Sequence, residues 1–320
     1  MCRPFRAPSS PAPNPGLTRP RFAGSARGYS LSTPSGWEYI LSLYFMIIDK
    51  SVRMEPISAA LITFNEEENI RGALESVSWA DEIVVVDSGS SDATLDLCRS
   101  FTDRIFHRDW SGFVDQKTHA VEQARHNWIL SLDADERLSP ALIAEIQRLR
   151  TSGFTAPGFR MPRVAFFMGR WIRHGDWYPD YQLRLFDRRK GRWQGGRVHE
   201  SVKTQGEPGL LEGEILHYTY RNLAAYLERL ETYSTLAAAD YQQRGKKSAG
   251  WKLVGHPLTT FLKTYFLKRG FQDGVPGLMV AAMGAISVFF KYAKLYELQH
   301  GHGDPSDCNS DTRHDRSIGL

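Results

Sequence analysis

The chain has 320 residues, of which 42% are hydrophobic and 24% charged, and its formal net charge is +4. This length can bury a substantial core and hold one large domain with an appendage, or two domains. The weak positive charge does not indicate nucleic acid, and no nucleic-acid partner is expected; it suits a phosphorylated substrate or an anionic membrane surface. The three cysteines are far apart, without metal-ligand spacing or a disulfide framework, which fits a reducing compartment.

The first 53 residues differ in composition from the rest of the chain. Residues 1–36 are rich in Pro, Ser, Gly and Arg and contain no acidic residue. This composition is compatible with a transit peptide, with a disordered segment, or with residues added by an upstream start codon. We favour a disordered or spurious extension over a transit peptide, and we expect the compact domain to begin at Met54.

From residue 57 onward, buried strands alternate with amphipathic helices. Apolar runs predict strands, and apolar residues at helical spacing predict the helices between them. The expected strands cover 57–63, 83–86, 104–106 and 128–132. The expected helices follow residue 70, Ser91–Asp92, Phe113 and Ser139–Pro140. Short connections between these elements predict a parallel, right-handed, doubly wound α/β sheet.

Three of the predicted strands end in polar residues, at 63–66, at Asp87–Ser88 and at Asp133-Ala134-Asp135. The carboxyl ends of parallel strands meet at one sheet edge, where open α/β folds bind ligands. Carboxylate oxygens suit Mg²⁺ or Mn²⁺, ions that usually reach proteins together with substrate phosphates. The sequence has neither a Gly-x-Gly-x-x-Gly after the first strand nor a Walker A motif, so the commonest nucleotide fingerprints are absent from it.

These strand ends resemble those of family 2 glycosyltransferases with the GT-A fold. Within that family, the chain is similar to lipopolysaccharide core β-1,4-glucosyltransferases, and the similarity extends to about residue 298. The family resemblance is carried by segments 63–69, 84–92 and 132–136, and the closer similarity by segments 178–186, 198–200 and 268–274. The resemblance implies a GT-A type, mostly parallel sheet, a nucleotide-sugar donor that is expected to be UDP-glucose, Mg²⁺ or Mn²⁺, and inversion at the anomeric carbon.

The same resemblance assigns the metal and the donor to the sheet edge. Asp135 is expected to ligate the metal, and Asp133 to bind the ribose or a metal-bound water. His199 is a candidate late ligand ahead of His217 and His174, although a structural histidine is the favoured interpretation of it. The expected donor-binding residues are Thr63, Asn65, Glu66, Asp87, Ser88, Lys117, Asp133 and Arg184. Among these, Asp87 can instead stabilise its turn, and Lys117 can instead be a solvated surface lysine.

Inversion by direct displacement requires a base that takes the proton of the acceptor hydroxyl. Asp180 is the expected base because it lies in an aromatic-rich stretch, where partial burial would raise the pKa of a carboxylate. The alternative is an ion pair between Asp180 and Arg184, four residues on. Glu200 and Asp176 are the fallback bases.

The C-terminal part of the chain is predicted to be helical, with Asn222 capping a long amphipathic helix. Between residues 251 and 296, aromatic residues alternate with lysines, a pattern typical of peripheral docking on anionic lipid; packing on the catalytic domain is the alternative. The apolar run 278–290 is too short to span a bilayer. The expected organisation is an extension (1–53), a catalytic domain (54–220), a helical membrane-associating appendage (221–298) and a disordered tail (299–320).

The sequence therefore predicts an inverting glycosyltransferase on the inner face of the cytoplasmic membrane. Its expected reaction moves glucose from UDP-glucose to a lipid-linked saccharide, the inner-core heptose of lipopolysaccharide. One alternative keeps the donor and replaces the acceptor by a polyprenyl phosphate or a peptide. The other is a non-catalytic, carbohydrate-binding GT-A module, and the clustered carboxylates at Asp87, Asp133 and Asp135 argue against it.

Overall fold

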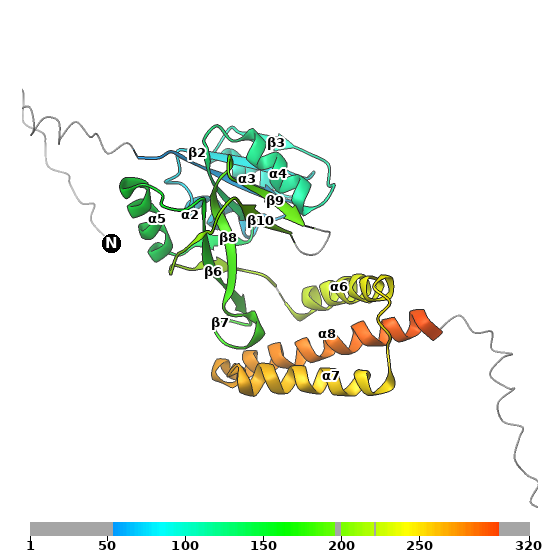
Figure 1. Cartoon of the computed structure of the whole chain (residues 1–320). Coiled ribbons are helices and arrows are strands. Elements are labelled where there is room, and N and C mark those ends of the chain that lie inside the picture. Colours follow the sequence, from blue (N-terminus) through cyan, green and yellow to red (C-terminus); the bar gives the residue numbers. More distant parts are fainter. Residues whose placement is uncertain (1–53, 196–199, 221, 301–320) are drawn as a thin grey trace, which may run out of the picture. The chain divides into compact units, whose positions relative to one another are not determined.

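A computed structural model describes residues 54–195, 200–220 and 222–300 (Figure 1). The expected N-terminal extension, most of the expected tail and the candidate ligand His199 lie outside the described residues.

The first half of the sheet has the predicted parallel topology, in the order β3-β2-β1-β4. Its strands are β1 (Ile57–Thr63), β2 (Glu82–Asp87), β3 (Ile105–His107) and β4 (Trp128–Asp133). The helices between them are α2 (Ile70–Ser76), α3 (Thr94–Arg99) and α4 (Phe113–Gln123). All of β1 and β2 is buried because both faces of this part of the sheet are covered. The α/β fold class is thereby confirmed.

The second half of the sheet is mixed, because the chain returns through antiparallel neighbours. Strand β8 runs antiparallel to β4 and to β6, and β12 runs parallel to β6. The bounds are β5 (Glu136–Leu138), β6 (Gly158–Phe167), β7 (Arg170–Ile172), β8 (Asp180–Asp187), β11 (Gly209–Leu210) and β12 (Ile215–His217). A separate hairpin joins β9 (Gly191–Gly195) to β10 (Glu200–Thr204). The parallel character therefore belongs to the first four strands, and the later strands supply the other half of the cavity described below.

The helical region begins with α6 (Leu223–Gln243), whose predicted cap is confirmed: the backbone N–H of Ala225 donates to Asn222 Oδ1 at 2.9 Å. Helix α7 (Gly250–Leu262) packs against α8 (Gly274–His300), and both can be followed in Figure 1. A π-helical turn, η2 (Lys263–Leu267), and a 3-10 turn, η3 (Gly270–Asp273), connect them.

The expectation that this region is too short to span a bilayer is wrong for α8. Among the described residues, the segment Gly270–His300 is long and apolar enough to cross a membrane, with a mean hydropathy of 1.6 over its apolar window. The expectation counted only the uninterrupted apolar run, whereas small residues and flanking lysines extend the same helix. Length and composition are the only grounds for this finding, and buried core helices also meet them.

Just before β12, the backbone at Gly213 passes close to the backbone at the start of α5 (Pro140–Ser152). A Cβ at Gly213 would lie 2.3 Å from Leu142 Cα. Beside it, Ser139 N–H donates to the Glu214 carbonyl at 3.0 Å, and Glu214 N–H donates to Ser139 Oγ at 3.1 Å. Only glycine fits here, because backbone atoms of α5 cannot move aside as a flexible side chain can.

We therefore expect Gly213→Ala to lower the free energy of unfolding by about 1–3 kcal/mol. Gly250→Ala is the matched control: its Cβ would meet nothing within 4 Å, and it should change stability by no more than about 1 kcal/mol. Urea unfolding followed by tryptophan fluorescence measures both. Equal stability of Gly213→Ala and the wild type would show that α5 and β12 can separate without cost.

Candidate active site

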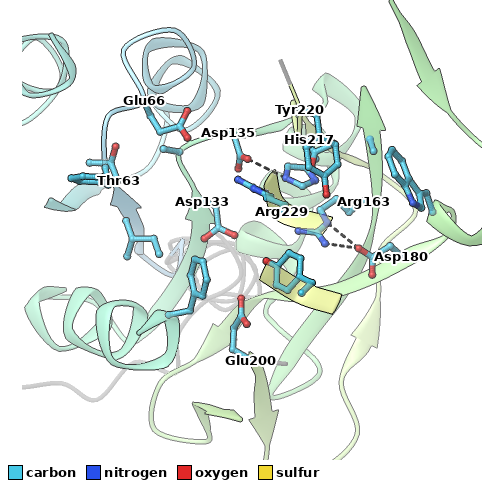
Figure 2. Close-up of a pocket in the computed structure, with 18 of the residues that line it drawn as sticks. Thr63, Glu66, Asp133, Asp135, Arg163, Asp180, Glu200, His217, Tyr220 and Arg229 are labelled. Carbon is cyan, nitrogen blue, oxygen red and sulfur yellow. Dashed lines mark hydrogen bonds and ion pairs between the residues drawn. The ribbon is translucent and has the colours of Figure 1, made fainter. Parts of the chain in front are cut away.

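A cavity of about 900 Å³ lies at the carboxyl ends of β1 and β4 (Figure 2). The strand ends contribute Asp133 and Asp135, as the sequence predicts for a shared sheet edge. The opposite side is built by segments distant in sequence, with Asp180 at the start of β8, Glu200 on β10 and His217 on β12. The cavity thus collects acidic and basic side chains from both halves of the sheet.

Asp133 is held between two cations of the protein. Lys117 Nζ lies 2.9 Å from Asp133 Oδ1, and Arg184 Nη2 lies 2.8 Å from Oδ2. Lys117 is 1% exposed, also pairs with Glu200 at 3.3 Å, and lies 4.7 Å from the ring centroid of Trp193. Lys117 is therefore not a solvated surface lysine; it reaches the aspartate cluster. Burial alone would raise the pKa of Asp133, but Lys117 and Arg184 outweigh it and hold that pKa well below its usual range.

The ion pairs continue from Arg184 to Asp180. Arg184 Nη2 contacts Glu136 Oε1 at 2.7 Å, and Arg163 Nη1 contacts the same oxygen at 2.9 Å. Arg163 Nη2 then contacts Asp180 Oδ2 at 2.6 Å (Figure 2). Burial opposes ionisation of Glu136, yet Arg184 keeps its pKa lowered. Five side chains of alternating charge thereby connect the end of β4 with the start of β8.

This network changes two expectations. Arg184 is almost fully buried and does not line the cavity, so its contacts assign it to holding Asp133 and Glu136, in place of the expected contact with the donor. The partner of Asp180 is Arg163 rather than Arg184, because β6 and β8 pair in a register that sets Arg163 opposite Asp180. Gln182 Nε2 also donates to Asp180 Oδ1 at 2.7 Å.

Asp135 and His217 form a second pair on the cavity wall. His217 Nε2 lies 3.2 Å from Asp135 Oδ2, and the two side chains are 14% and 13% exposed (Figure 2). The described residues contain no group of three or more potential protein ligands for a metal. One carboxylate and one imidazole nevertheless fit a divalent cation that takes its remaining ligands from water and a diphosphate. Among the described residues, which do not include His199, the histidine that lies against Asp135 is His217, ranked behind His199 from the sequence.

The residues at the ends of β1 and β2 have two roles: some line the cavity, and others stabilise the loop between the strand ends. Thr63, Glu66 and Ser88 line the cavity. Asp87 is buried and accepts hydrogen bonds from the backbone N–H groups of Gly89 and Ser90 at 2.8 and 2.9 Å. Asn65 has a left-handed backbone (φ 52°), and its Oδ1 accepts from Ser91 N–H at 2.9 Å. Asp87 and Asn65 thus shape the loop between the strand ends.

Asp176 lines the cavity, but its carboxylate is bound by the helical region. Lys268 Nζ lies 2.6 Å from Asp176 Oδ1, and Thr264 Oγ1 donates to Oδ2. Burial opposes ionisation of Asp176, yet hydrogen bonds from Lys268 and Thr264 leave its pKa lowered. A lowered pKa makes Asp176 a weak proton acceptor.

Two charged cavity residues, Arg163 and Arg229, were not found from the sequence. Arg163 lies in the middle of β6, and only its pairing with β8 reveals its partner. Arg229 lies on α6, a helix interpreted as scaffold, and its guanidinium lies 5.4 Å from the ring centroid of Tyr220. In the described part of the chain, Arg229 forms no ion pair with a carboxylate, and no sequence signal distinguished it from other helical arginines.

Comparisons with known proteins confirm the resemblance seen in the motifs. Residues 58–203 match the family described as Glycosyl transferase family 2. A lipopolysaccharide core biosynthesis glycosyltransferase of Rhizobium meliloti, LpsC, is 33% identical over 249 residues, which are 76% of this chain and 92% of that protein. An uncharacterised glycosyltransferase of Rickettsia typhi is 29% identical over 257 residues, 77% of this chain and 88% of that protein. A solved fragment of S. aureus TarS with UDP-GlcNAc aligns with a TM-score of 0.39 and 12% identity, over 77% of this chain and 92% of that fragment.

The Asp133 ion pairs generate a prediction on stability and pH. Because the pKa of Asp133 is lowered in the folded protein, its contribution to stability is present above its unfolded pKa of about 4 and is lost as pH falls toward the folded value. Lys117→Met should therefore lower the free energy of unfolding at pH 7 by about 1–3 kcal/mol; Asp133 keeps a side chain that is 23% exposed, which limits the loss. The difference from the wild type should shrink toward pH 3.

Urea unfolding at pH 7, 5 and 3 measures this difference. Lys203→Met, which removes an exposed lysine on β10, is the control and should remain close to the wild type at each pH. A difference for Lys117→Met that is the same at every pH would mean that lost packing, and not the ion pair, causes it.

Proposed function

Because the chain belongs to glycosyl transferase family 2, we propose that it is a metal-dependent, inverting hexosyltransferase that moves glucose from UDP-glucose to a lipid-linked saccharide. The observation that carries the proposal is the cavity itself. There a candidate cation site, Asp135 with His217, and a candidate base, Asp180, line the same space (Figure 2). Cation and base are the two functions that an inverting displacement with a diphosphate leaving group requires.

The proposed acceptor is the inner-core heptose of lipopolysaccharide. The similarity to LpsC, a lipopolysaccharide core biosynthesis glycosyltransferase, supports this acceptor class over 92% of that protein's length. The proposed location is the inner face of the cytoplasmic membrane, where the protein would dock as a peripheral protein on anionic lipid. The length of α8 is the one observation that favours the alternative of a polyprenyl phosphate acceptor, which would itself be embedded in a bilayer.

The donor diphosphate is assigned to the wall formed by Asp135, His217 and Arg229. Mg²⁺ or Mn²⁺ held by Asp135 and His217 would supply positive charge to stabilise the departing nucleoside diphosphate. Arg229 offers a guanidinium without a carboxylate partner among the described residues, and arginine matches phosphate oxygens in pairs. Asp133 is less suited to ligate a metal, since both of its oxygens face cations of the protein.

The proposed reaction uses Asp180 as the base. The acceptor hydroxyl oxygen forms a bond to the anomeric carbon of glucose while the bond from that carbon to the diphosphate oxygen breaks. The hydroxyl proton passes to Asp180, and the electron pair of the broken bond leaves with UDP. Arg163 orients Asp180, because two of its nitrogens donate to one carboxylate oxygen at 2.9 and 2.6 Å. Glu200, paired with Lys117, is the fallback base.

The metal assignment predicts that Asp135→Asn and His217→Gln each weaken Mn²⁺ binding at least about tenfold in the presence of UDP. Titration of Mn²⁺ by electron paramagnetic resonance measures this without depending on turnover. Asp176→Asn is the matched control, because Lys268 and Thr264 already occupy that carboxylate. Wild-type Mn²⁺ affinity in Asp135→Asn would exclude the assignment.

The base assignment predicts that Asp180→Asn lowers transfer by about 10²–10⁴-fold while UDP-glucose affinity stays unchanged. Transfer is measured as UDP release with lipopolysaccharide truncated at the inner-core heptose, and a mass spectrum of the product identifies the acceptor. Glu200→Gln is the parallel variant. Retained transfer in Asp180→Asn together with lost transfer in Glu200→Gln would move the base to Glu200.

A further inference from the structure

The connection between α7 and α8 contacts the cavity wall from outside. We name residues 263–275 the α7–α8 corner. Its residues Lys268 and Thr264 bind the carboxylate of Asp176, which lines the cavity, and the backbone N–H of Gly175 donates to the Lys268 carbonyl at 2.9 Å. The corner is therefore in direct contact with the segment that precedes the candidate base.

Asp273, also in the corner, binds the same segment through a second set of contacts. Its Oδ2 accepts the backbone N–H groups of Arg173 and His174 at 3.0 and 2.8 Å. Its Oδ1 lies 3.0 Å from His174 Nδ1. Since Asp273 is buried, these contacts are shielded from water and fix residues 173–176 to the corner.

The corner itself is tightly packed. A Cβ at Gly277 would lie 2.0 Å from the Gly270 carbonyl oxygen, and a Cβ at Gly270 would lie 2.8 Å from the Thr264 carbonyl oxygen. The backbone of the turns is thus in direct contact with the backbone at the start of α8. The turns that carry Thr264 and Lys268 are therefore packed directly on the start of α8.

The outer side of the corner exposes large apolar side chains. Phe266, Leu267 and Phe271 are 55%, 80% and 47% exposed, and Val275 is 70% exposed. Such a cluster of exposed apolar residues is typical of a surface that binds a partner or a membrane.

The charge of the helical region indicates which kind of partner the corner binds. Residues 246–296 contain eight Lys and Arg residues and a single acidic residue, Asp273, which is buried against His174. Aromatic and apolar side chains flanked by Lys268 and Arg269 suit the interface of a bilayer with anionic headgroups. A second copy of the same surface would bring like charges together, so self-association through the corner is disfavoured.

We propose that the α7–α8 corner inserts Phe266, Leu267 and Phe271 into an anionic lipid surface and thereby fixes the cavity wall at Asp176 through Lys268 and Asp273. This inference rests on the proposed function, because lipid binding by the corner would prepare the cavity for transfer at the membrane, where a lipid-linked acceptor is located. Lys268 acts in it as a positioning residue, and its contact with Asp176 couples lipid binding to the acceptor side of the cavity.

The lipid contact is tested by sedimentation of the full chain with phosphatidylcholine vesicles that contain or lack 30% phosphatidylglycerol. We expect binding that requires phosphatidylglycerol and falls at least tenfold in Phe266→Ser/Leu267→Ser. Leu210→Ser, which changes an exposed leucine on β11, is the control and should bind like the wild type. Equal binding to both vesicle types, or wild-type binding by the double variant, would overturn the proposal, as would a dimer that the double variant dissociates.

The coupling is tested by Lys268→Met against Arg269→Met. Each removes one positive charge from the corner, but only Lys268 contacts Asp176. Both should weaken vesicle binding about fivefold. Only Lys268→Met should abolish the slower amide hydrogen exchange of residues 173–176 that we expect when anionic vesicles are added, and raise KM for the lipid-linked acceptor at saturating vesicle concentration.

Vesicle binding without any change in exchange at residues 173–176 would refute the coupling. So would identical KM values for the two variants. Hydrolysis of UDP-glucose by the same preparations, measured without lipid, separates this inference from the proposed function. If hydrolysis is present and vesicle binding is absent, only the inference fails.

Discussion

The carboxylate of Asp133 lies between Lys117 and Arg184, and the cavity floor depends on this arrangement. A lysine that is 1% exposed is stable only if its charge is compensated nearby, because burying an uncompensated ammonium is very costly. Asp133 and Glu200 supply that compensation from β4 and β10. Arg184 also forms an ion pair with Glu136, and Glu136 forms one with Arg163. Strands far apart in sequence are thereby held in one arrangement by a set of charges that stabilise one another.

The two aspartates of the Asp-x-Asp motif consequently differ in role. Asp133 is satisfied by cations that belong to the protein, whereas Asp135 faces an imidazole, a group that can itself ligate a metal. The Asp176 and Asp180 carboxylates are likewise each bound by a cation of the protein. Of these four cavity carboxylates, Asp135 is the one best placed to accept positive charge from outside the chain. This difference is the physical basis for the proposal that Asp135 binds the cation.

The helical region adds a second level of organisation. Its corner contacts the segment that carries Asp176, and its outer side is apolar and surrounded by positive charge. An enzyme whose acceptor is embedded in lipid would benefit from completing its acceptor site only at the membrane, where the acceptor is present. Lys268 contacts Asp176 on the cavity wall, and Asp273 holds the neighbouring residues Arg173 and His174. These contacts provide a direct route for such a dependence.

Local patterns in the chain predicted much of this protein. The strands β1, β2 and β4, the helix cap at Asn222 and the polar strand ends all follow from periodicity and neighbouring residues, because the interactions that create them span only a few positions. Family motifs then located Asp133 and Asp135 correctly at the cavity. Such patterns could not predict which side chains these residues contact. Arg163 meets Asp180 only through the β6–β8 register, and His217 reaches Asp135 from a strand of three residues, too short to show a period. The burial of Lys117 likewise depends on what surrounds it in space. Ion pairs form between side chains that are close in space, whatever their separation in the sequence. The pairing of each cation with its carboxylate was therefore determined only by the tertiary structure.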